Sequence, residues 1–228
     1  MDKMIVYEDD TLLVVHKPAG IATETAKIGQ ADVVSELKNY RRKKGETPYI
    51  GVVHRLDQPV EGLLVFAKDA GAAKKLSAGL QNGQLSKKYA ALVAGTPQAQ
   101  DGTLSDYLIK DGRTNLSKVV PEGTDGAKKA ALQWKLLRSS STGAYALLEI
   151  ELYTGRHHQI RVQMAHAGFP LLGDTKYGSA QTKELSAQLS IHNVALAANE
   201  LSLIHPVTGK KMHFSLDINK FLHVIGME

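Results

Sequence analysis

The sequence predicts an α+β fold built on a large, mostly antiparallel or mixed β-sheet with flanking helices. Strand-like segments outnumber helical ones, and they follow one another in runs instead of alternating with helices. Hydrophobic residues make up 43% and charged residues 22% of the 228 positions, as in a globular protein with its own core. No repeat, linker or low-complexity tract divides the chain, so we expect a single domain over residues 1–228.

The first third of the chain is expected to hold strands and two helices. In chain order these are a hairpin at 4–16, a helix at 32–43, a short apolar strand at 50–53, a buried strand at 63–67 and a helix from 69 to 82. Asp32 and Asp69 precede apolar residues at helical spacing and suit the N-cap position. Gly45 and the pair Asn82-Gly83 mark the points where the helices end.

The remainder of the chain is expected to be mostly strand. Strands are expected at 87–93, 103–109, 131–137, 145–152, 189–197 and 211–214, with a helix at 156–167 and a short helix in the tail from 216. Leu132, Trp134 and Leu136 alternate with polar residues, so their strand buries one face. The turn-rich sequence S-S-S-T-G at 139–143 indicates that the strands on either side form a long hairpin.

Composition excludes several classes of protein. No run reaches the roughly 18 apolar residues of a membrane helix, and acids stand where a signal peptide would be apolar. The absence of cysteine excludes disulfides and thiolate sites and suits the cytoplasm, the compartment we expect. The net charge of +5 favours an anionic partner, and the basic run at 38–44 is the strongest candidate for contact with phosphates.

Several common site types are absent from the sequence. There is no phosphate-binding glycine loop, no G-x-S-x-G nucleophile motif and no H-E-x-x-H zinc motif. His157, His158 and His166 are close in sequence, but adjacent side chains on a helix diverge by about 100° and do not readily share a metal. No metal site is expected.

A polar turn between two apolar strands carries a carboxylate. Residues 54–57 read H-R-L-D and separate the strands expected at 50–53 and 63–67. Asp57 either bonds its own backbone, as Asp does in turns, or acts on a substrate from the rim of a rigid sheet. The residue types alone leave both interpretations open.

A second segment, residues 154–174, combines arginines with a helical pattern. As a helix it directs Ile160 and Met164 toward the core, while Arg156 and Arg161 lie on other flanks. The guanidinium groups either form a solvated basic face or point at a buried carboxylate or a phosphate, which Arg binds better than Lys does.

Several motifs in this order resemble the RluA-type pseudouridine synthases. They are Y-E-D-D…V-V-H-K-P-A-G at 7–20, H-R-L-D followed by G-L-L-V-F-A-K at 54–68, K-Y-A-A-L-V-A-G at 88–95, and G-R-H-H-Q-I-R with a later G-D-T-K-Y-G at 155–178. The resemblance runs from about residue 5 to 214, and the ordered set is far more specific than any one motif. It implies a pseudouridine-synthase-like catalytic fold with a central cleft.

In that family the Asp of H-R-L-D is catalytic, and the matching residue here is Asp57. The resemblance implies that uridine in RNA is converted to its carbon-linked isomer without a cofactor or metal. An ionised Asp57 would attack ribose carbon 1′ or remove a ribose proton to give a glycal, and the sequence leaves both routes open. A carboxylate in a partly dry pocket needs a nearby cation, and the family motif points to Arg161 over Arg156 as that partner.

Other site residues are carried over from the family by position. Tyr89 matches the active-site tyrosine, whose ring would stack on the flipped uracil and whose hydroxyl would help to manage the carbon 5 proton. Arg55 would hold the place that the extruded base leaves. We expect Arg156, His54 and Lys88 to contact the RNA as well.

The chain departs from many relatives in two respects. The sequence Q-P-V-E-G at 58–62 stands where they have T-S-G, and Glu61 adds an acid that is expected to change substrate choice. The family-like segment begins at residue 5, so we expect no N-terminal RNA-binding domain. The partner is then expected to be a compact stem-loop of ribosomal or transfer RNA, bound by a monomer that does not associate with membranes.

Two other functions compete with this one. A non-catalytic RNA-binding module of the same fold would be free to lose Asp57, Tyr89 or Arg161, yet the chain has all three. A nucleoside glycosidase would need a second carboxylate. Glu61 and Asp174 are the candidates for that role, although Asp174 is better suited to shaping a loop.

Overall fold

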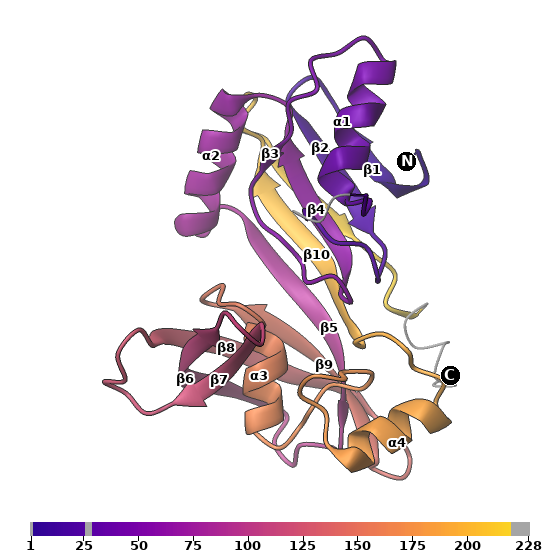
Figure 1. The fold of residues 1–228 in the computed structure, drawn as a ribbon, viewed down its shortest axis with the longest axis vertical. Coiled ribbons are helices and arrows are strands. Elements are labelled where there is room, and N and C mark those ends of the chain that lie inside the picture. The colour runs from indigo at the N-terminus through magenta and orange to yellow at the C-terminus, as the bar shows by residue number, and fades with distance from the viewer. Residues whose placement is uncertain (1, 26–28, 220–228) are drawn as a thin grey trace. The chain divides into compact units, whose positions relative to one another are not determined.

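The computed structural model describes residues 2–25 and 29–219 and is drawn in Figure 1. The chain divides into two compact units, Met1–Lys87 with Ala197–Leu216 and Lys88–Leu196 with Asp217–Glu228. It passes from the first unit to the second within strand β5 (Ser86–Ala94) and returns at the start of strand β10 (Leu196–Ile204).

The first unit combines a sheet with two helices. Its elements are the 3-10 helix η1 (Asp2–Met4), β1 (Ile5–Glu8), β2 (Leu12–Lys17), α1 (Val33–Lys43), β3 (Gly51–Val52), β4 (Glu61–Ala67), α2 (Ala70–Gln81), most of β10, and β11 (Lys211–Ser215). The strands run in the order β1-β2-β4-β10-β11, and β3 also pairs with β4. All of these pairs are antiparallel except β4 with β10, which makes the sheet mixed.

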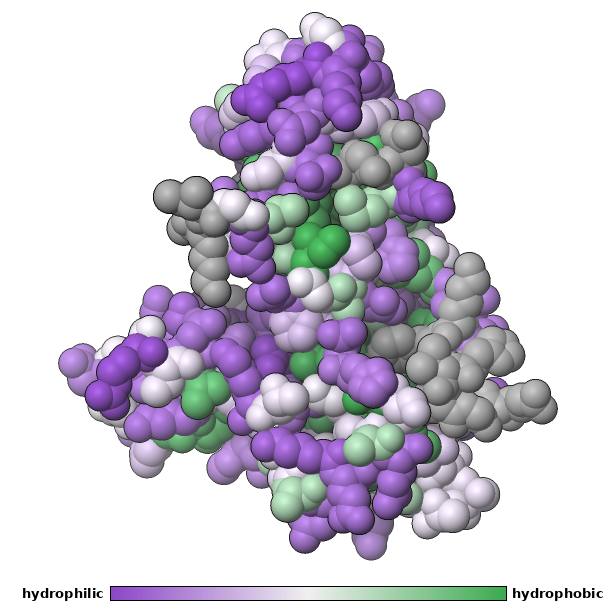
Figure 2. Space-filling view, turned by 45° about the vertical axis from the view of Figure 1, so that its right-hand side comes forward, coloured by the Kyte–Doolittle hydropathy of each residue, from purple (hydrophilic) through white to green (hydrophobic). Residues whose placement is uncertain are grey.

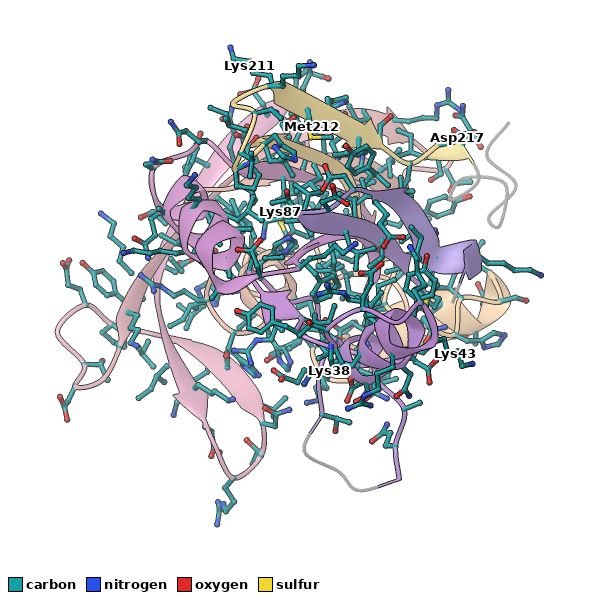
Figure 3. All side chains as sticks on the ribbon, turned by 90° about the horizontal axis from the view of Figure 1, so that it is seen from above. Lys38, Lys43, Lys87, Lys211, Met212 and Asp217 are labelled. Carbon is teal, nitrogen blue, oxygen red and sulfur yellow. The ribbon has the colours of Figure 1, made fainter. Side chains whose placement is uncertain are left out.

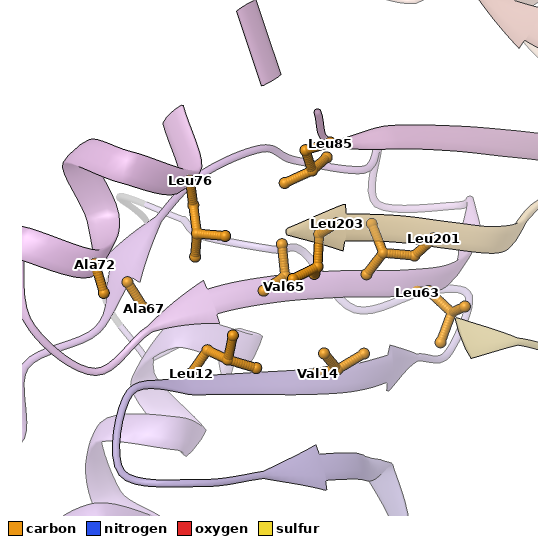
Figure 4. Packing of buried hydrophobic residues seen from close by; sticks show 10 residues of the cluster. All are labelled: Leu12, Val14, Leu63, Val65, Ala67, Ala72, Leu76, Leu85, Leu201 and Leu203. Carbon is orange, nitrogen blue, oxygen red and sulfur yellow. The ribbon is translucent and has the colours of Figure 1, made fainter. Parts of the chain in front are cut away.

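The core of the first unit lies between its central strands and helix α2. Figure 4 shows ten buried side chains of this cluster. Both faces of β4 are covered, because Leu63, Leu64, Val65 and Phe66 are all 0% exposed. A strand buried on both faces reads as a continuous apolar run. This is why the segment G-L-L-V-F-A is recognisable as a central strand from sequence.

The helices of the first unit begin at the expected caps. The Asp32 carboxylate accepts a hydrogen bond from the Ser35 backbone N–H at 2.7 Å, and the Asp69 carboxylate accepts one from Ala72 at 2.8 Å. Each bond satisfies an N–H group that the first turn of a helix leaves unpaired. The predictions of both helices are confirmed.

The second unit is an antiparallel sheet with two short helices. Its elements are the rest of β5, β6 (Asp101–Asp111), β7 (Leu116–Val120), β8 (Lys128–Ser139), β9 (Tyr145–Leu152), α3 (Gln159–His166) and α4 (Ala180–Gln188). The strand order is β5-β9-β8-β6-β7. The long hairpin expected from the turn at 139–143 is formed by β8 and β9. The predicted α+β class with a mixed, mostly antiparallel sheet is confirmed.

Two element boundaries differ clearly from the sequence prediction, and strand β7 and helix α4 were not predicted. The helix expected at 156–167 begins only at Gln159, and the strand expected at 189–197 begins only at Leu196. Helix α4 was not predicted, because it buries Thr182 and Ser186 instead of an apolar stripe. The helix expected in the tail from 216 falls largely on residues 220–228, which lie outside the described residues.

The face of the protein that Figure 2 draws is mostly polar. Figure 2 shows hydrophilic side chains over most of the visible face, with hydrophobic ones in small patches. Within residues 2–25 and 29–219, no helix has both the length and the apolar character needed to cross a bilayer.

Candidate active site

Asp57 lies in the turn that leads into the buried strand β4. The Val60 N–H donates to the Asp57 carbonyl at 3.0 Å and closes this turn. Asp57 is half-buried, while Arg55 and Gln58 on either side are exposed. The turn thus presents a carboxylate and a guanidinium at the edge of a rigid sheet, which is the arrangement that suits action on a bound substrate.

The turn is held from one side by the segment that follows β2. The Gly20 N–H donates to the Gln58 carbonyl at 2.8 Å, and Nε2 of Gln58 donates to the Gly20 carbonyl at 3.0 Å. Oγ1 of Thr23 accepts from the Leu56 N–H at 3.1 Å and donates to the Leu56 carbonyl at 3.0 Å. The backbone is therefore fixed at the residue before Asp57 and at the residue after it.

Lys17, at the end of β2, is a site residue that the sequence analysis missed. Its side chain is fully buried, and Nζ donates to the carbonyls of Pro18 at 3.0 Å, Ile21 at 2.7 Å and Gln58 at 3.2 Å. Burial lowers the pKa of Lys17 to about 8, although the carboxylates of Asp57 and Glu61 act in the opposite direction. The signal in the sequence was a lysine that ends an otherwise apolar strand.

Glu61 begins β4 and is half-buried. Its charge acts on Lys17 together with that of Asp57, and both charges oppose the lowering of the Lys17 pKa by burial. Glu61, the acid that was expected to change substrate choice, therefore lies in the electrostatic field of the same cation as Asp57.

His54 links the start of this turn to strand β4. Its ring is 7% exposed, and Nε2 accepts a hydrogen bond from the Val65 N–H at 3.3 Å. Burial, helped by the charge of Lys87, holds the pKa of His54 well below its usual value, so the ring is neutral. We therefore assign His54 to supporting β4, while its predicted contact with RNA remains untested.

In the second unit, Arg161 on α3 is bound by Asp174 through two parallel hydrogen bonds. Nε lies 2.7 Å from Oδ2 and Nη2 lies 2.9 Å from Oδ1. Burial alone would raise the pKa of Asp174, but the hydrogen bonds and charge of Arg161, with the N–H groups of Lys176 and Tyr177, hold it below the usual value. Asp174 thus fixes the guanidinium and also shapes its own loop, as the sequence analysis expected.

Tyr177 covers the guanidinium and joins it to two other elements. Its ring centroid lies 5.3 Å from Cζ of Arg161, in cation–π range. Its hydroxyl accepts from the Ser117 N–H at 2.8 Å and lies 2.8 Å from Nδ1 of His158. Arg161 therefore sits in a packed polar cluster that extends from β7 to the 174–178 loop.

The residues before α3 are not helical, which corrects the expected geometry of the two histidines. His158 has a φ of 53°, and its ring stacks on that of His157 with centroids 3.7 Å apart. Gln159 closes the turn that precedes the helix, because Oε1 accepts from the Arg156 N–H at 2.9 Å. The sequence alone could not show this, since the left-handed conformation at His158 is rare for a residue other than glycine.

The other predicted residues of the second unit lie on its sheet and its loops. Tyr89 on β5 is 4% exposed and is paired with Ile150 on β9. Lys88 forms a surface ion pair with Glu149 at 3.1 Å. Arg156 is exposed, and its Nε donates to the Lys129 carbonyl at 2.9 Å. Asp57 belongs to the first unit and Tyr89 and Arg161 to the second, so their association in one site remains a prediction.

The basic run at 38–44 divides into structural and exposed cations. Arg41 is buried, and its Nη1 donates to the carbonyls of Tyr49 and Lys68. Lys44 pairs with Glu8 at 3.1 Å. Arg42 and Lys43 are exposed, and Figure 3 labels Lys38 and Lys43 on helix α1. The run is therefore not one continuous phosphate-binding patch.

Comparison with known proteins identifies the family. A family model described as RNA pseudouridylate synthase matches residues 11–166, which include the Asp57 turn, Tyr89 and Arg161. The chain belongs to this family. The RluA-type resemblance is confirmed by its similarity to named ribosomal large subunit pseudouridine synthases C and D.

Similar proteins extend this finding. An uncharacterized RNA pseudouridine synthase of Bacillus subtilis is 36% identical over 206 residues, which cover 90% of this chain and 65% of that protein. Ribosomal large subunit pseudouridine synthase D of Vibrio cholerae is 36% identical over 219 residues, 92% of this chain and 65% of that protein. This chain thus spans about two thirds of the length of these relatives.

A solved structure shows the same fold. Human RNA pseudouridylate synthase domain containing 4 matches with a TM-score of 0.77 and 23% identity, over 98% of this chain and 93% of that one. At this identity the likeness concerns the fold alone. It agrees with the pseudouridine-synthase-like fold that the sequence predicts, and the central cleft remains a prediction.

Proposed function

We propose that this protein is an RNA pseudouridine synthase in which Asp57 is the catalytic carboxylate. The observation that carries the proposal is the Asp57 turn, whose H-R-L-D sequence lies within the matched family segment. Hydrogen bonds fix this turn at Leu56 and at Gln58. The charge of Asp57 also acts on the pKa of the buried Lys17. Such a support holds a carboxylate in one place relative to a bound nucleotide.

The proposed reaction exchanges one bond to ribose carbon 1′ for another. The bond from carbon 1′ to uracil N1 breaks, the uracil turns, and carbon 5 bonds to carbon 1′. Carbon 5 then loses its proton and N1 gains one, so atoms and electrons balance without an oxidant, a cofactor or a metal. Asp57 attacks carbon 1′ or removes a ribose proton, and both routes require its ionised form.

Two residues of the second unit complete the proposed chemistry. Arg161 serves as the cation for Asp57, and its support by Asp174 suits that role because the guanidinium is already oriented. Tyr89 stacks on the uracil and helps to move the carbon 5 proton. These roles rest on the family resemblance of each position.

We propose that the substrate is a stem-loop of ribosomal or transfer RNA. Several relatives are named for the ribosomal large subunit, which favours ribosomal RNA as the first candidate. The target uridine must leave its stack before the carboxylate can reach it, at a cost of a few kcal/mol. Arg55, which is exposed two residues before Asp57, would occupy the vacated position, and Arg156 and Lys88 would bind phosphates. We propose a cytoplasmic monomer that acts as a single catalytic domain.

Asp174 is a poor candidate for the second carboxylate that the nucleoside glycosidase alternative requires. A glycosidase needs one carboxyl group that stays protonated near neutral pH. Asp174 has a lowered pKa and donates no proton to a ligand while it holds Arg161.

The test is release of tritium from RNA labelled at uracil carbon 5, isolated from cells that lack this protein. We expect release by the wild-type protein and none by Asp57→Asn, with RNA affinity changed by no more than a few-fold because the carboxylate acts in chemistry. Release by Asp57→Asn above about a hundredth of the wild-type rate would exclude Asp57 as the catalytic group. Tight RNA binding without release by the wild type would instead support the non-catalytic binding module.

A further inference from the structure

We propose that Thr23 is a positioning residue that sets the orientation of the Asp57 carboxylate; this inference rests on the proposed function. Thr23 lies in the irregular segment between β2 and α1, and its side chain is 2% exposed. It is separated from Leu56 by 33 residues in sequence, yet its hydroxyl makes both of its hydrogen bonds to the Leu56 backbone.

The two bonds act on the two peptide groups that flank Leu56. The hydroxyl oxygen accepts from the Leu56 N–H at 3.1 Å, which fixes the peptide between Arg55 and Leu56. The hydroxyl proton is donated to the Leu56 carbonyl at 3.0 Å, which fixes the peptide between Leu56 and Asp57. Because a peptide group is planar, the second bond also fixes the Cα position of Asp57.

Thr23 is itself held by the start of a helix. The Val34 N–H donates to the Thr23 carbonyl at 3.1 Å, and the Val33 N–H donates to the Ala22 carbonyl at 3.1 Å. These are N–H groups of the first turn of α1, which have no partner within the helix. The position of the Asp57 turn is therefore coupled through one hydroxyl to the N-terminus of α1.

The far side of the turn has its own support. The Gln58 carbonyl accepts from the Gly20 N–H and from Nζ of Lys17, and the Asp57 carbonyl accepts from the Val60 N–H. Among the described residues, the side chain that bonds the backbone before Asp57 is that of Thr23. Loss of its hydroxyl leaves that side without a side-chain anchor and leaves a buried N–H and carbonyl unpaired.

The proposed reaction is sensitive to the orientation of the Asp57 carboxylate. A carboxylate that must meet ribose carbon 1′ or a ribose proton works within a narrow range of distance and angle, and a displacement of about 1 Å costs on the order of 100-fold in rate. Thr23 acts through the backbone, so its loss is expected to lower kcat while KM for RNA stays nearly constant.

Three variants test this role. Thr23→Val keeps the volume and the β-branch but removes both hydrogen bonds, whereas Thr23→Ser keeps the hydroxyl. Thr182→Val is the matched control, because Thr182 is 3% exposed, lies on α4 in the second unit and also uses its hydroxyl in a hydrogen bond. We expect kcat for tritium release to fall at least about tenfold in Thr23→Val and to stay within about threefold of wild type in Thr23→Ser and Thr182→Val.

A second readout does not depend on activity. Hydrogen exchange at the Leu56 N–H should accelerate at least about tenfold in Thr23→Val, and it should stay near the wild-type rate in Thr23→Ser and Thr182→Val. An unchanged kcat in a folded Thr23→Val protein would overturn the proposal, as would a loss of kcat in Thr182→Val equal to that in Thr23→Val. Failure of the wild-type protein to release tritium would overturn the proposed function itself, and the positioning role with it.

Discussion

Arg161 and Asp174 form a buried, two-bond ion pair, in which the side chains are 3% and 0% exposed and the shortest N···O distance is 2.7 Å. The carboxylate accepts two further bonds from the N–H groups of Lys176 and Tyr177. Removing one partner of such a buried pair strongly destabilises the folded protein, because the other charge stays in a dry environment.

Asp174→Asn should therefore destabilise the protein by about 3–5 kcal/mol, because it removes the charge of the buried carboxylate that Arg161 bonds through two of its nitrogens. Denaturant unfolding followed by fluorescence would measure this loss. Glu149→Gln is the control, since Glu149 pairs with Lys88 at the surface with a similar distance of 3.1 Å. That exposed pair should contribute no more than about 1 kcal/mol, so equal losses in the two variants would contradict the prediction.

The same pair predicts a pH dependence at the acid end. The pKa of Asp174 is lower in the folded protein than in the unfolded chain. Its contribution to stability is then fully present above about pH 4 and is lost as the pH falls through the folded pKa. The stability difference between wild type and Asp174→Asn should shrink as the pH falls below about 4, and a constant difference would show that the charge of Asp174 does not matter.

Lys17 predicts a second pH dependence, at the alkaline end and with the same sign. Its pKa is lowered from 10.5 to about 8 in the folded protein, so between these values the unfolded chain binds more protons. Stability from this group must then rise as the pH rises from about 8 toward 10.5, because the folded protein can bury a neutral amine. Lys17→Met should remove this rise, and it should also lower stability at pH 7 because three carbonyls lose their donor.

The comparison that checks Lys17 is the difference between two unfolding curves measured at several pH values. Other lysines and tyrosines titrate in the same range, but they are common to wild type and Lys17→Met and cancel in the difference. A difference that does not change between pH 7 and pH 10 would mean that Lys17 keeps an ordinary pKa in the folded protein.

Much of the fold could be predicted because its signals are local. The caps at Asp32 and Asp69, the apolar run of β4 and the turn between β8 and β9 are each legible within a few residues. Helix α4 was missed for the same reason, since it buries hydroxyl-bearing side chains that give no apolar period.

The candidate site was only partly predictable because its supports are long-range. Asp57 could be singled out by its turn and its family motif, but Thr23 and Lys17 bond residues that lie 33 and 41 positions away. A contact of this kind leaves no period or spacing in the sequence. The sequence allowed a buried carboxylate as a partner of the arginines at 154–174, but it did not identify Asp174, 13 residues from Arg161, as that carboxylate.

The exposed half of the basic run at 38–44 can be separated from its structural half. Arg42→Ala with Lys43→Ala should reduce the slope of log affinity against log salt by about 1–2, if both contact phosphates, and should leave the melting temperature unchanged. Arg41→Ala should instead lower stability by about 2 kcal/mol or more, because the carbonyls of Tyr49 and Lys68 lose a buried charged donor. An unaltered salt slope in the first variant would mean that Arg42 and Lys43 are solvated side chains of α1 that do not contact phosphates.

Gly173 makes the loop of Asp174 possible, and its substitution is the sharpest test of that loop. Its φ is 71°, and a Cβ added there would overlap the Asn193 carbonyl oxygen. Gly168 in the same unit also has a positive φ, of 90°, but a Cβ there would meet nothing within 4 Å. Gly168→Ala should therefore cost only about 1 kcal/mol of conformational strain.

Gly173→Ala carries the same strain and a clash with backbone that cannot rotate away, so the loop must move. We expect a loss of more than about 3 kcal/mol in unfolding free energy, since displacement of the loop also breaks the bond between Arg161 and Asp174. Tritium release should fall with it, because Arg161 loses the carboxylate that orients it. Equal stability of Gly173→Ala and Gly168→Ala would show that the close approach of this loop to Asn193 does not hold Asp174 in place.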